Sequence, residues 1–158
     1  MTTILRVRAP TSNEIEAANR AEACAILIRL GYRVYRPEAD CYGEDLIVRD
    51  QNGELHSVQL KSRPTVDWKR YGEKKQMLML FPDPSGGSAS GRKWYLVPHN
   101  LLYRWMKKEH GHAPKWNDSW SDPTVSKRLG KFLKPFVILE SKFRGIIPVF
   151  PTRIENRE

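Results

Sequence analysis

Apolar positions recur along this chain with two different periods. Residues 13–31 have helical spacing, Thr11 or Ser12 can cap the N-terminus of that helix, and Gly31 is placed to end it. Residues 99–111 repeat the helical spacing, and a shorter helix is expected to begin near Pro123. The pattern therefore predicts one helix early in the chain and two late ones.

Between those helices lie short segments rich in Val, Ile and Leu, which are typical of β-strands. They cover residues 32–37, 45–49, 55–62, 77–81 and 93–98. We expect a polar connection over 63–76, a loop over 82–91, and an irregular or edge segment over 144–158. This order predicts a mixed α/β domain with a central sheet of about five strands flanked by helices, and no boundary divides residues 1–158.

The sequence "DQNGE" predicts a hairpin and fixes its register. If Asp50 pairs with Glu54 around a three-residue turn with Gly53 in the left-handed position, Asp45 lies opposite Gln59. Lys61 is two residues further and shares the face of Gln59. Val58 and Leu60 point to the other side, where they can join the core.

A carboxylate, an amide and an amine on one face suit a divalent metal and a phosphodiester. The alternative is a surface Asp–Lys pair that contributes under ~1 kcal/mol. The flanking apolar residues favour central strands and hence the metal site. Glu44, on the opposite face from Asp45, and Glu38, ahead of the loop, rank below Asp45 as ligands.

The first helix can supply a second acid. Counting about 100° per residue puts Glu22 on a stripe with Ala18, Ala25 and Ile26, and a carboxylate inside an apolar stripe needs a partner. Glu16 lies about 120° away from Glu22 and can pair with Arg20 at (i, i+4). Glu22 is therefore the favoured acid, with an edge-of-core glutamate as the alternative and Glu16 as the other residue that can complete the site.

The charge of +9 adds a polyanionic partner to this picture. Residues 1–90 hold 13 Lys and Arg against 12 Asp and Glu, whereas residues 91–158 hold 14 against 6. Such an uneven excess favours nucleic acid. No segment approaches the ~20 apolar residues that cross a membrane, and the N-terminus is too polar for a signal peptide. We therefore expect a cytoplasmic protein with Cys24 and Cys41 reduced, a disulfide being the alternative.

Residues 12–63 contain, in order, a helix that carries Glu22 and the segments "GYRVYRP", "GEDLIV" and "VQLKS". In this they resemble the PD-(D/E)XK phosphodiesterase superfamily of metal-dependent nucleases. The resemblance implies a restriction-endonuclease-like core over residues 12–81, completed by the basic, aromatic-rich residues 91–158. Asp45 matches the family's Asp, Lys61 its lysine and Glu22 its first-helix glutamate. Gln59 stands where an acid is usual, and an amide oxygen is a neutral ligand.

The resemblance implies Mg²⁺-dependent hydrolysis of DNA, with Mn²⁺ as a possible substitute. Asp45, Gln59, Glu22 and the Leu60 carbonyl would hold the metal, and Lys61 would orient or deprotonate water. Cutting both strands would favour a homodimer or higher homo-oligomer.

Several residues outside this set are candidates for DNA contact. Arg63, Lys69 and Arg70 follow Lys61 directly, and Ser57 shares its face. In the C-terminal part, Trp94 and Trp105 are expected in the core. Trp116 and Trp120 can belong either to the core or to a surface that stacks on bases. His99 can either cap its helix or contact DNA. His56 is expected on a face of the sheet.

Two other classes of function remain open. The first is a catalytically inactive nucleic-acid-binding module with the same fold, which the Gln59 departure favours. The second is a structural or interaction domain in which Asp45 and Lys61 serve only the sheet.

Overall fold

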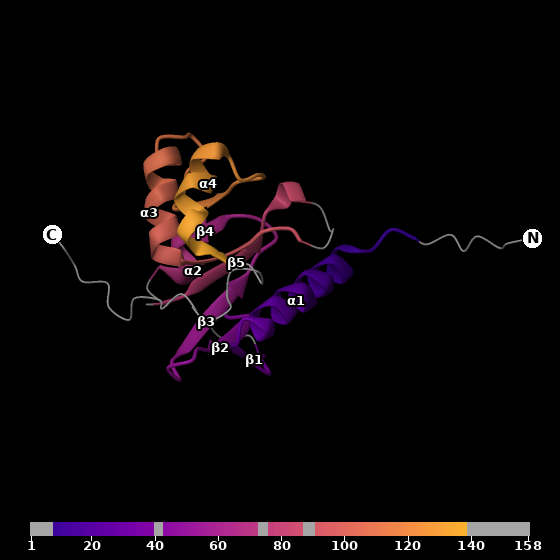
Figure 1. Cartoon of the computed structure of the whole chain (residues 1–158). Coiled ribbons are helices and arrows are strands. Elements are labelled where there is room, and N and C mark those ends of the chain that lie inside the picture. Colours follow the sequence, from indigo (N-terminus) through magenta and orange to yellow (C-terminus); the bar gives the residue numbers. More distant parts are fainter. Residues whose placement is uncertain (1–7, 40–42, 73–75, 87–90, 139–158) are drawn as a thin grey trace, which may run out of the picture.

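The computed structural model describes residues 8–39, 43–72, 76–86 and 91–138 (Figure 1). The helices are α1 (Ser12–Arg29), α2 (Trp68–Tyr71), α3 (His99–His110) and α4 (Lys127–Leu133), with 3-10 turns η1 (Pro84–Gly86) and η2 (Lys134–Phe136). The strands are β1 (Arg33–Tyr35), β2 (Leu46–Arg49), β3 (Leu55–Leu60), β4 (Thr65–Asp67), β5 (Leu78–Pro82), β6 (Trp94–Pro98), β7 (Ser119–Ser121) and β8 (Val137–Ile138).

The main sheet is mixed and has six strands in the order β1-β2-β3-β5-β6-β8. Strands β3 and β5 are parallel, and every other neighbouring pair is antiparallel. The mixed α/β class is therefore confirmed. The expected count of about five is one strand short, because β8 has only two residues and gives no periodic signal.

The first helix begins and ends where the sequence predicts. The Thr11 side chain accepts a hydrogen bond from the Glu14 backbone, and the Glu14 side chain accepts one from the Thr11 backbone, forming a capping box. Gly31 follows the last turn at φ +94°, a conformation that glycine adopts without steric cost.

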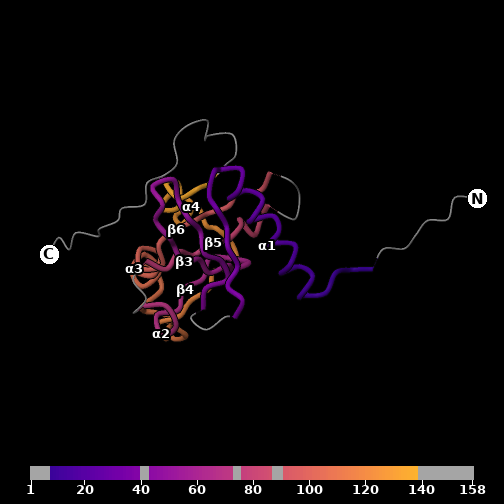
Figure 2. The backbone as a smooth tube through the Cα atoms, turned by 90° about the horizontal axis from the view of Figure 1, so that it is seen from below, coloured from indigo at the N-terminus to yellow at the C-terminus, as the bar shows by residue number. Residues whose placement is uncertain are grey.

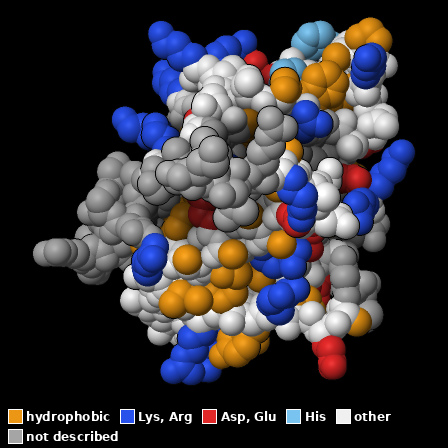
Figure 3. All heavy atoms as spheres, turned by 90° about the vertical axis from the view of Figure 1, so that its right-hand side faces the viewer, with side chains coloured by type: hydrophobic (Ala, Val, Ile, Leu, Met, Phe, Trp, Pro, Cys, Tyr) orange, Lys and Arg blue, Asp and Glu red, His pale blue; other side chains and the backbone are white. Residues whose placement is uncertain are grey.

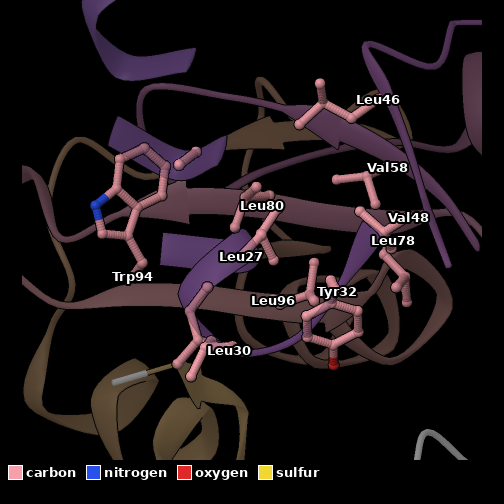
Figure 4. Packing of buried hydrophobic residues seen from close by; sticks show 12 residues of the cluster. Leu27, Leu30, Tyr32, Leu46, Val48, Val58, Leu78, Leu80, Trp94 and Leu96 are labelled. Atoms are coloured by element: carbon pink, nitrogen blue, oxygen red, sulfur yellow. The ribbon is translucent and has the colours of Figure 1, made fainter. Parts of the chain in front are cut away.

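Helices cover both faces of the sheet. On one face, Leu27 of α1 and the C-cap residue Leu30 pack onto Val58, Leu80 and other strand side chains (Figure 4). On the other face, α3 and α4 supply Leu102, Met106, Leu129 and Leu133, which pack with Met79 and Val97. Figure 2 shows α1 on one side of β3 and β5, and α3 on the other. The hairpin β2–β3 adds Leu46, Val48 and Val58 to the first of these faces only. On its other face Ile47 is half-buried and Leu55 is 61% exposed, so the burial on both faces that its apolar residues favour is not found for this hairpin.

The connection predicted over 63–76 contains regular structure. It forms β4 and α2, and β4 pairs with β7 in a separate two-stranded sheet. Three- and four-residue elements are too short to show a period, so the sequence pattern missed them. The helix expected near Pro123 begins at Lys127, because Ser126 is its N-cap and accepts from the Leu129 backbone.

The outer surface of α1 is partly apolar. Ile15 is 47% exposed and Ile28 is 58% exposed, so apolar residues lie on more than one side of this helix. Figure 3 shows the molecule from this side, where hydrophobic side chains gather in the lower half among Lys and Arg side chains. No helix in the described part of the chain is both long and apolar enough to cross a bilayer. The expected tail 144–158 and Cys41 lie outside the described residues, whereas Cys24 is a half-buried free thiol.

Candidate functional site

The hairpin register agrees with the prediction from its turn. Gly53 has φ +83°, and the Asp50 backbone nitrogen donates to the Glu54 carbonyl at 2.9 Å. Leu46 pairs with Val58, and the Asp45 nitrogen donates to the Val58 carbonyl. Asp45 therefore lies beside Gln59 at the end of the hairpin remote from the turn.

Two hydrogen bonds fix the Asp45 carboxylate. Its Oδ2 accepts from Gln59 Nε2 at 2.6 Å and from the Leu60 backbone nitrogen at 2.8 Å. Gln59 Nε2 also lies 3.3 Å from the Leu60 carbonyl oxygen, so the amide lies between two oxygens of the site. Gln59 is buried and Asp45 is half-buried, which strengthens these bonds relative to exposed ones.

These residues open into a pocket of about 460 Å³ between the hairpin and α1. Its lining consists of Asp45, Gln59, Leu60, Lys61 and Ser62 from the hairpin side, and Ser12, Ile15, Glu16 and Asn19 from α1. The structure therefore gathers four of the predicted site residues, Asp45, Gln59, Leu60 and Lys61, around one opening. Neither Glu44 nor Glu38 lines it.

Lys61 is held just beyond β3. Its backbone nitrogen donates to the Leu80 carbonyl at 2.9 Å, and its Nζ lies 5.8 Å from the centroid of the Tyr71 ring. Burial lowers the pKa of Lys61, and the positive charge of Arg70 lowers it further. The carboxylates of Asp45, Asp67 and Glu16 oppose this change in pKa, so the amine lies among charges of both signs.

Glu22 does not line this pocket, which corrects the expectation that it faces Asp45. Its carboxylate accepts from Arg92 Nε at 2.9 Å, from Arg92 Nη2 at 2.7 Å and from Trp94 Nε1 at 2.9 Å. These hydrogen bonds lower the pKa of Glu22 despite the opposing effect of burial. The partner that a partly buried carboxylate needs is thus Arg92, far along the chain.

Glu16 lies where Glu22 was expected. The buried stripe of α1 runs through Ala23 and Leu27 and continues to the C-cap residue Leu30. Seven residues span about 700°, or about 20° less than two turns, so Glu16 continues the line of Ala23 toward the N-terminus of the helix. Its Oε1 lies 3.3 Å from Arg20 Nη2, which is the predicted (i, i+4) pair, yet the residue still lines the pocket.

Asn19 also lines the pocket, although the sequence pattern did not indicate it. It lies one turn after Glu16, and its Oδ1 accepts from Arg92 Nη2 at 2.7 Å. Asn19 therefore connects the pocket with the Glu22–Arg92 pair. The signal that could have found both Glu16 and Asn19 is their common line with Ala23 on the helix.

The predicted DNA-contacting residues lie outside the pocket lining. Arg63, Lys69 and Arg70 are exposed on the segment that follows Lys61, and Arg70 lies 5.6 Å from the Tyr71 ring centroid. Ser57 is half-buried opposite Ile47 on the hairpin. The arrangement gives a basic segment beside the pocket rather than a ring of cations within it.

The structure also shows where the tryptophan and histidine side chains considered in the sequence lie. Trp94 is fully buried, as expected. Trp105, on α3 and also expected in the core, is half-buried, as are Trp116 and Trp120, and all three pack against the core to which α3 and α4 contribute. His99 is buried at the start of α3, and its Nε2 accepts from the Asp67 backbone nitrogen, so it is a core residue. His56 is buried, and its Nε2 lies 2.8 Å from Asp50 Oδ2, a contact that stabilises the hairpin turn.

The donor set of the pocket suits a hard divalent cation. It offers the carboxylates of Asp45 and Glu16, the Leu60 carbonyl and the amide oxygen of Gln59. Mg²⁺ commonly takes one or two carboxylates and completes its shell with water and substrate phosphate. Among the described residues no three His, Cys, Asp or Glu side chains form a metal-binding group, and the acids that line the pocket are Asp45 and Glu16.

Comparisons with known proteins identify no relative of this chain. No family model, no curated protein and no solved structure matches it.

Proposed function

We propose that this protein is a metal-dependent endonuclease that hydrolyses DNA phosphodiester bonds. The observation that carries the proposal is the convergence of Asp45, Glu16, Gln59 and Lys61 on one pocket beside an exposed basic segment. The resemblance of the hairpin residues to the PD-(D/E)XK superfamily supports the same function and the restriction-endonuclease-like core.

Asp45 and Glu16 would hold Mg²⁺ or Mn²⁺, with the Leu60 carbonyl and the Gln59 amide as further ligands. Such an ion would polarise the scissile phosphate and make a nearby water more acidic. The chain itself supplies the remaining functions. Leu60 N–H fixes the orientation of the Asp45 carboxylate, and Lys61 offsets the negative charge that develops on the phosphate. Because its pKa is lowered, the Lys61 amine can also take a proton from water more readily than an exposed lysine.

The charge distribution supports DNA as substrate. Arg63, Lys69 and Arg70 can bind phosphates on either side of the one that enters the pocket. One pocket of this kind cuts one strand at a time, so we propose a homodimer or higher homo-oligomer for double-strand cleavage. We also propose that the protein acts in the cytoplasm, where the Cys24 thiol stays reduced.

A supercoiled-plasmid nicking assay in Mg²⁺ or Mn²⁺ tests the proposal. Asp45→Ala and Lys61→Ala are expected to abolish nicking while DNA binding in EDTA persists. Glu44→Ala, next to Asp45 but outside the pocket lining, and Lys93→Ala, an exposed lysine on another segment, serve as matched controls that keep activity. Nicking that survives Asp45→Ala would overturn the proposal.

One observation favours a second function, an inactive DNA-binding module. Gln59 is neutral at a position where the PD-(D/E)XK superfamily usually has an acid. Its amide N–H also donates a hydrogen bond to Asp45 Oδ2, the oxygen that would bind a metal. Salt-dependent DNA binding by the wild type without nicking in either metal would support this alternative.

A further inference from the structure

Trp68 is an exposed aromatic residue on the basic segment that follows the candidate site in the chain. All five tryptophans lie in the described residues, and Trp68 alone is exposed, with 39% of its surface accessible. It opens α2, one turn before Tyr71, the ring that Lys61 faces. The exposed indole thus lies one helical turn from a ring that Lys61 of the candidate site contacts, where a bound strand can reach it.

Contacts with Tyr103 and Gly72 hold the Trp68 ring in place. Its centroid is 4.7 Å from that of Tyr103 at an interplanar angle of 31°, and Tyr103 is itself fixed by its hydroxyl, which donates to Asp118 Oδ1. The Trp68 backbone nitrogen donates to the Asp118 carbonyl at 2.8 Å. Gly72 lies directly against the indole, since a Cβ there would overlap the ring. The side chain thus loses little conformational freedom when a ligand binds.

The surroundings of Trp68 favour an anionic ligand. Lys69 and Arg70 follow it on α2, Arg63 precedes it, and all three are exposed. The neighbouring acid, Asp67, is half-buried and its Oδ1 accepts from the Arg70 backbone nitrogen as the N-cap of α2. A planar apolar ring among solvent-facing cations matches a nucleotide, which combines a π-face with a phosphate.

We propose that Trp68 is a stacking platform for an unpaired base of the DNA strand that enters the pocket. The inference rests on the proposed function, because it takes DNA as the substrate. It adds the class of DNA: a single strand, or a duplex with an unpaired base near the cut. The exposed ring stacks on the base, while Arg63, Lys69 and Arg70 bind the flanking phosphates.

Binding measured in EDTA tests this without cleavage. The probes are a single-stranded oligonucleotide carrying 2-aminopurine and its fully paired duplex. Trp68→Ala is expected to weaken single-strand binding about 10-fold and to remove the quenching of 2-aminopurine, with duplex binding changed less than about 2-fold. Trp68→Phe keeps a ring and should recover most of the affinity. Tyr35→Ala, at an exposed aromatic on β1, is the matched control.

Gly72→Ala gives an independent test that leaves the indole present. Its φ of −62° and ψ of −35° accept alanine, so the added methyl acts mainly by displacing the Trp68 ring. We expect the same selective loss of single-strand binding, with circular dichroism confirming the fold of every variant.

Equal losses for single strand and duplex, unchanged binding in Trp68→Ala, or no DNA binding by the wild type would each overturn the inference. Trp68-dependent single-strand binding by a protein that nicks nothing would instead uphold it while the nuclease proposal fails.

Discussion

Gln59 Nε2 donates to Asp45 Oδ2 at 2.6 Å. The same nitrogen lies 3.3 Å from the Leu60 carbonyl, so a neutral N–H occupies the space between two oxygens that could bind a cation. The amide thus links the Asp45 carboxylate to the Leu60 carbonyl. A cation that binds Asp45 and Leu60 must displace it, and the Gln59 side chain must rotate to present its oxygen.

Gln59→Glu is therefore expected to exchange stability for metal affinity. The substitution removes the donor and brings a second carboxylate to Asp45, so the free energy of unfolding should fall by about 1–3 kcal/mol in EDTA. Millimolar Mg²⁺ should recover the loss, because the ion binds the folded state alone. Urea unfolding with and without Mg²⁺ measures both effects. Gln51→Glu in the exposed turn is the control, and a Gln59→Glu protein that ignores Mg²⁺ would contradict the metal assignment.

Glu16 and Glu22 are expected to differ in what their removal costs. Glu16→Gln should lower the nicking rate at least about 10-fold, with under ~0.5 kcal/mol lost in stability, because its pair with Arg20 is exposed. Glu22→Gln should leave the chemistry intact. It should lower the free energy of unfolding by about 1–3 kcal/mol, because the Arg92 side chain is only 9% exposed and loses its charged partner.

Nicking rates and urea unfolding of the two variants together separate the roles. The reverse pattern, with Glu22→Gln inactive and stable, would return Glu22 to the site. Arg92→Gln should reproduce the stability loss of Glu22→Gln, and a double variant should lose little more, since the two residues form one pair.

The sequence was sufficient to locate the hairpin half of the site. A glycine at φ +83° sets the turn, and strand pairing then transmits the register without further choice to Asp45 and Gln59. Lys61 directly follows β3, so its position next to Gln59 and Leu60 also places it at the pocket. Local rules reach this far because every step depends on residues within about 15 positions of one another.

The helix half could not be derived in the same way. Apolar residues surround α1, with Ile15 and Ile28 exposed and Ala23 and Leu27 buried, so hydrophobicity alone does not mark the inward face. The apolar stripe of Ala18, Ala25 and Ile26 favours Glu22 in the sequence. Its real partner, Arg92, is 70 positions away, and no local pattern indicates a contact of that range.

The basic segment after β3 should determine the salt dependence of DNA binding. If Arg63, Lys69 and Arg70 each bind one phosphate, replacing any of them with Ala should reduce the slope of log K against log[salt] by about 1. Fluorescence anisotropy of a labelled duplex in EDTA at several salt concentrations gives this slope. Arg33→Ala, on the edge strand β1, should leave it unchanged. A slope that is insensitive to all three substitutions would remove this segment from the interface.

The buried His99 side chain is expected to make the free energy of unfolding depend on pH. It is 1% exposed, its Nε2 accepts from the Asp67 backbone nitrogen at 3.1 Å, and it therefore folds as the neutral imidazole. Burial lowers its pKa from 6.5 to about 4, while the nearby charge of Asp67 opposes the change.

Because protonation favours the unfolded chain, the contribution of His99 to stability is complete above pH 6.5 and is lost as the pH falls toward 4. The loss should reach about 3 kcal/mol. His99→Gln keeps an acceptor near the Nε2 position without a titrating ring, so its free energy of unfolding should be lower than wild type at pH 7 and should fall less between pH 6.5 and 4. Urea unfolding across this range measures the difference, and His112→Gln, at an exposed histidine, is the matched control. Parallel pH profiles for wild type and His99→Gln would mean that the ring titrates as it does in water, and that the acceptor role of Nε2 beneath α2 is wrong.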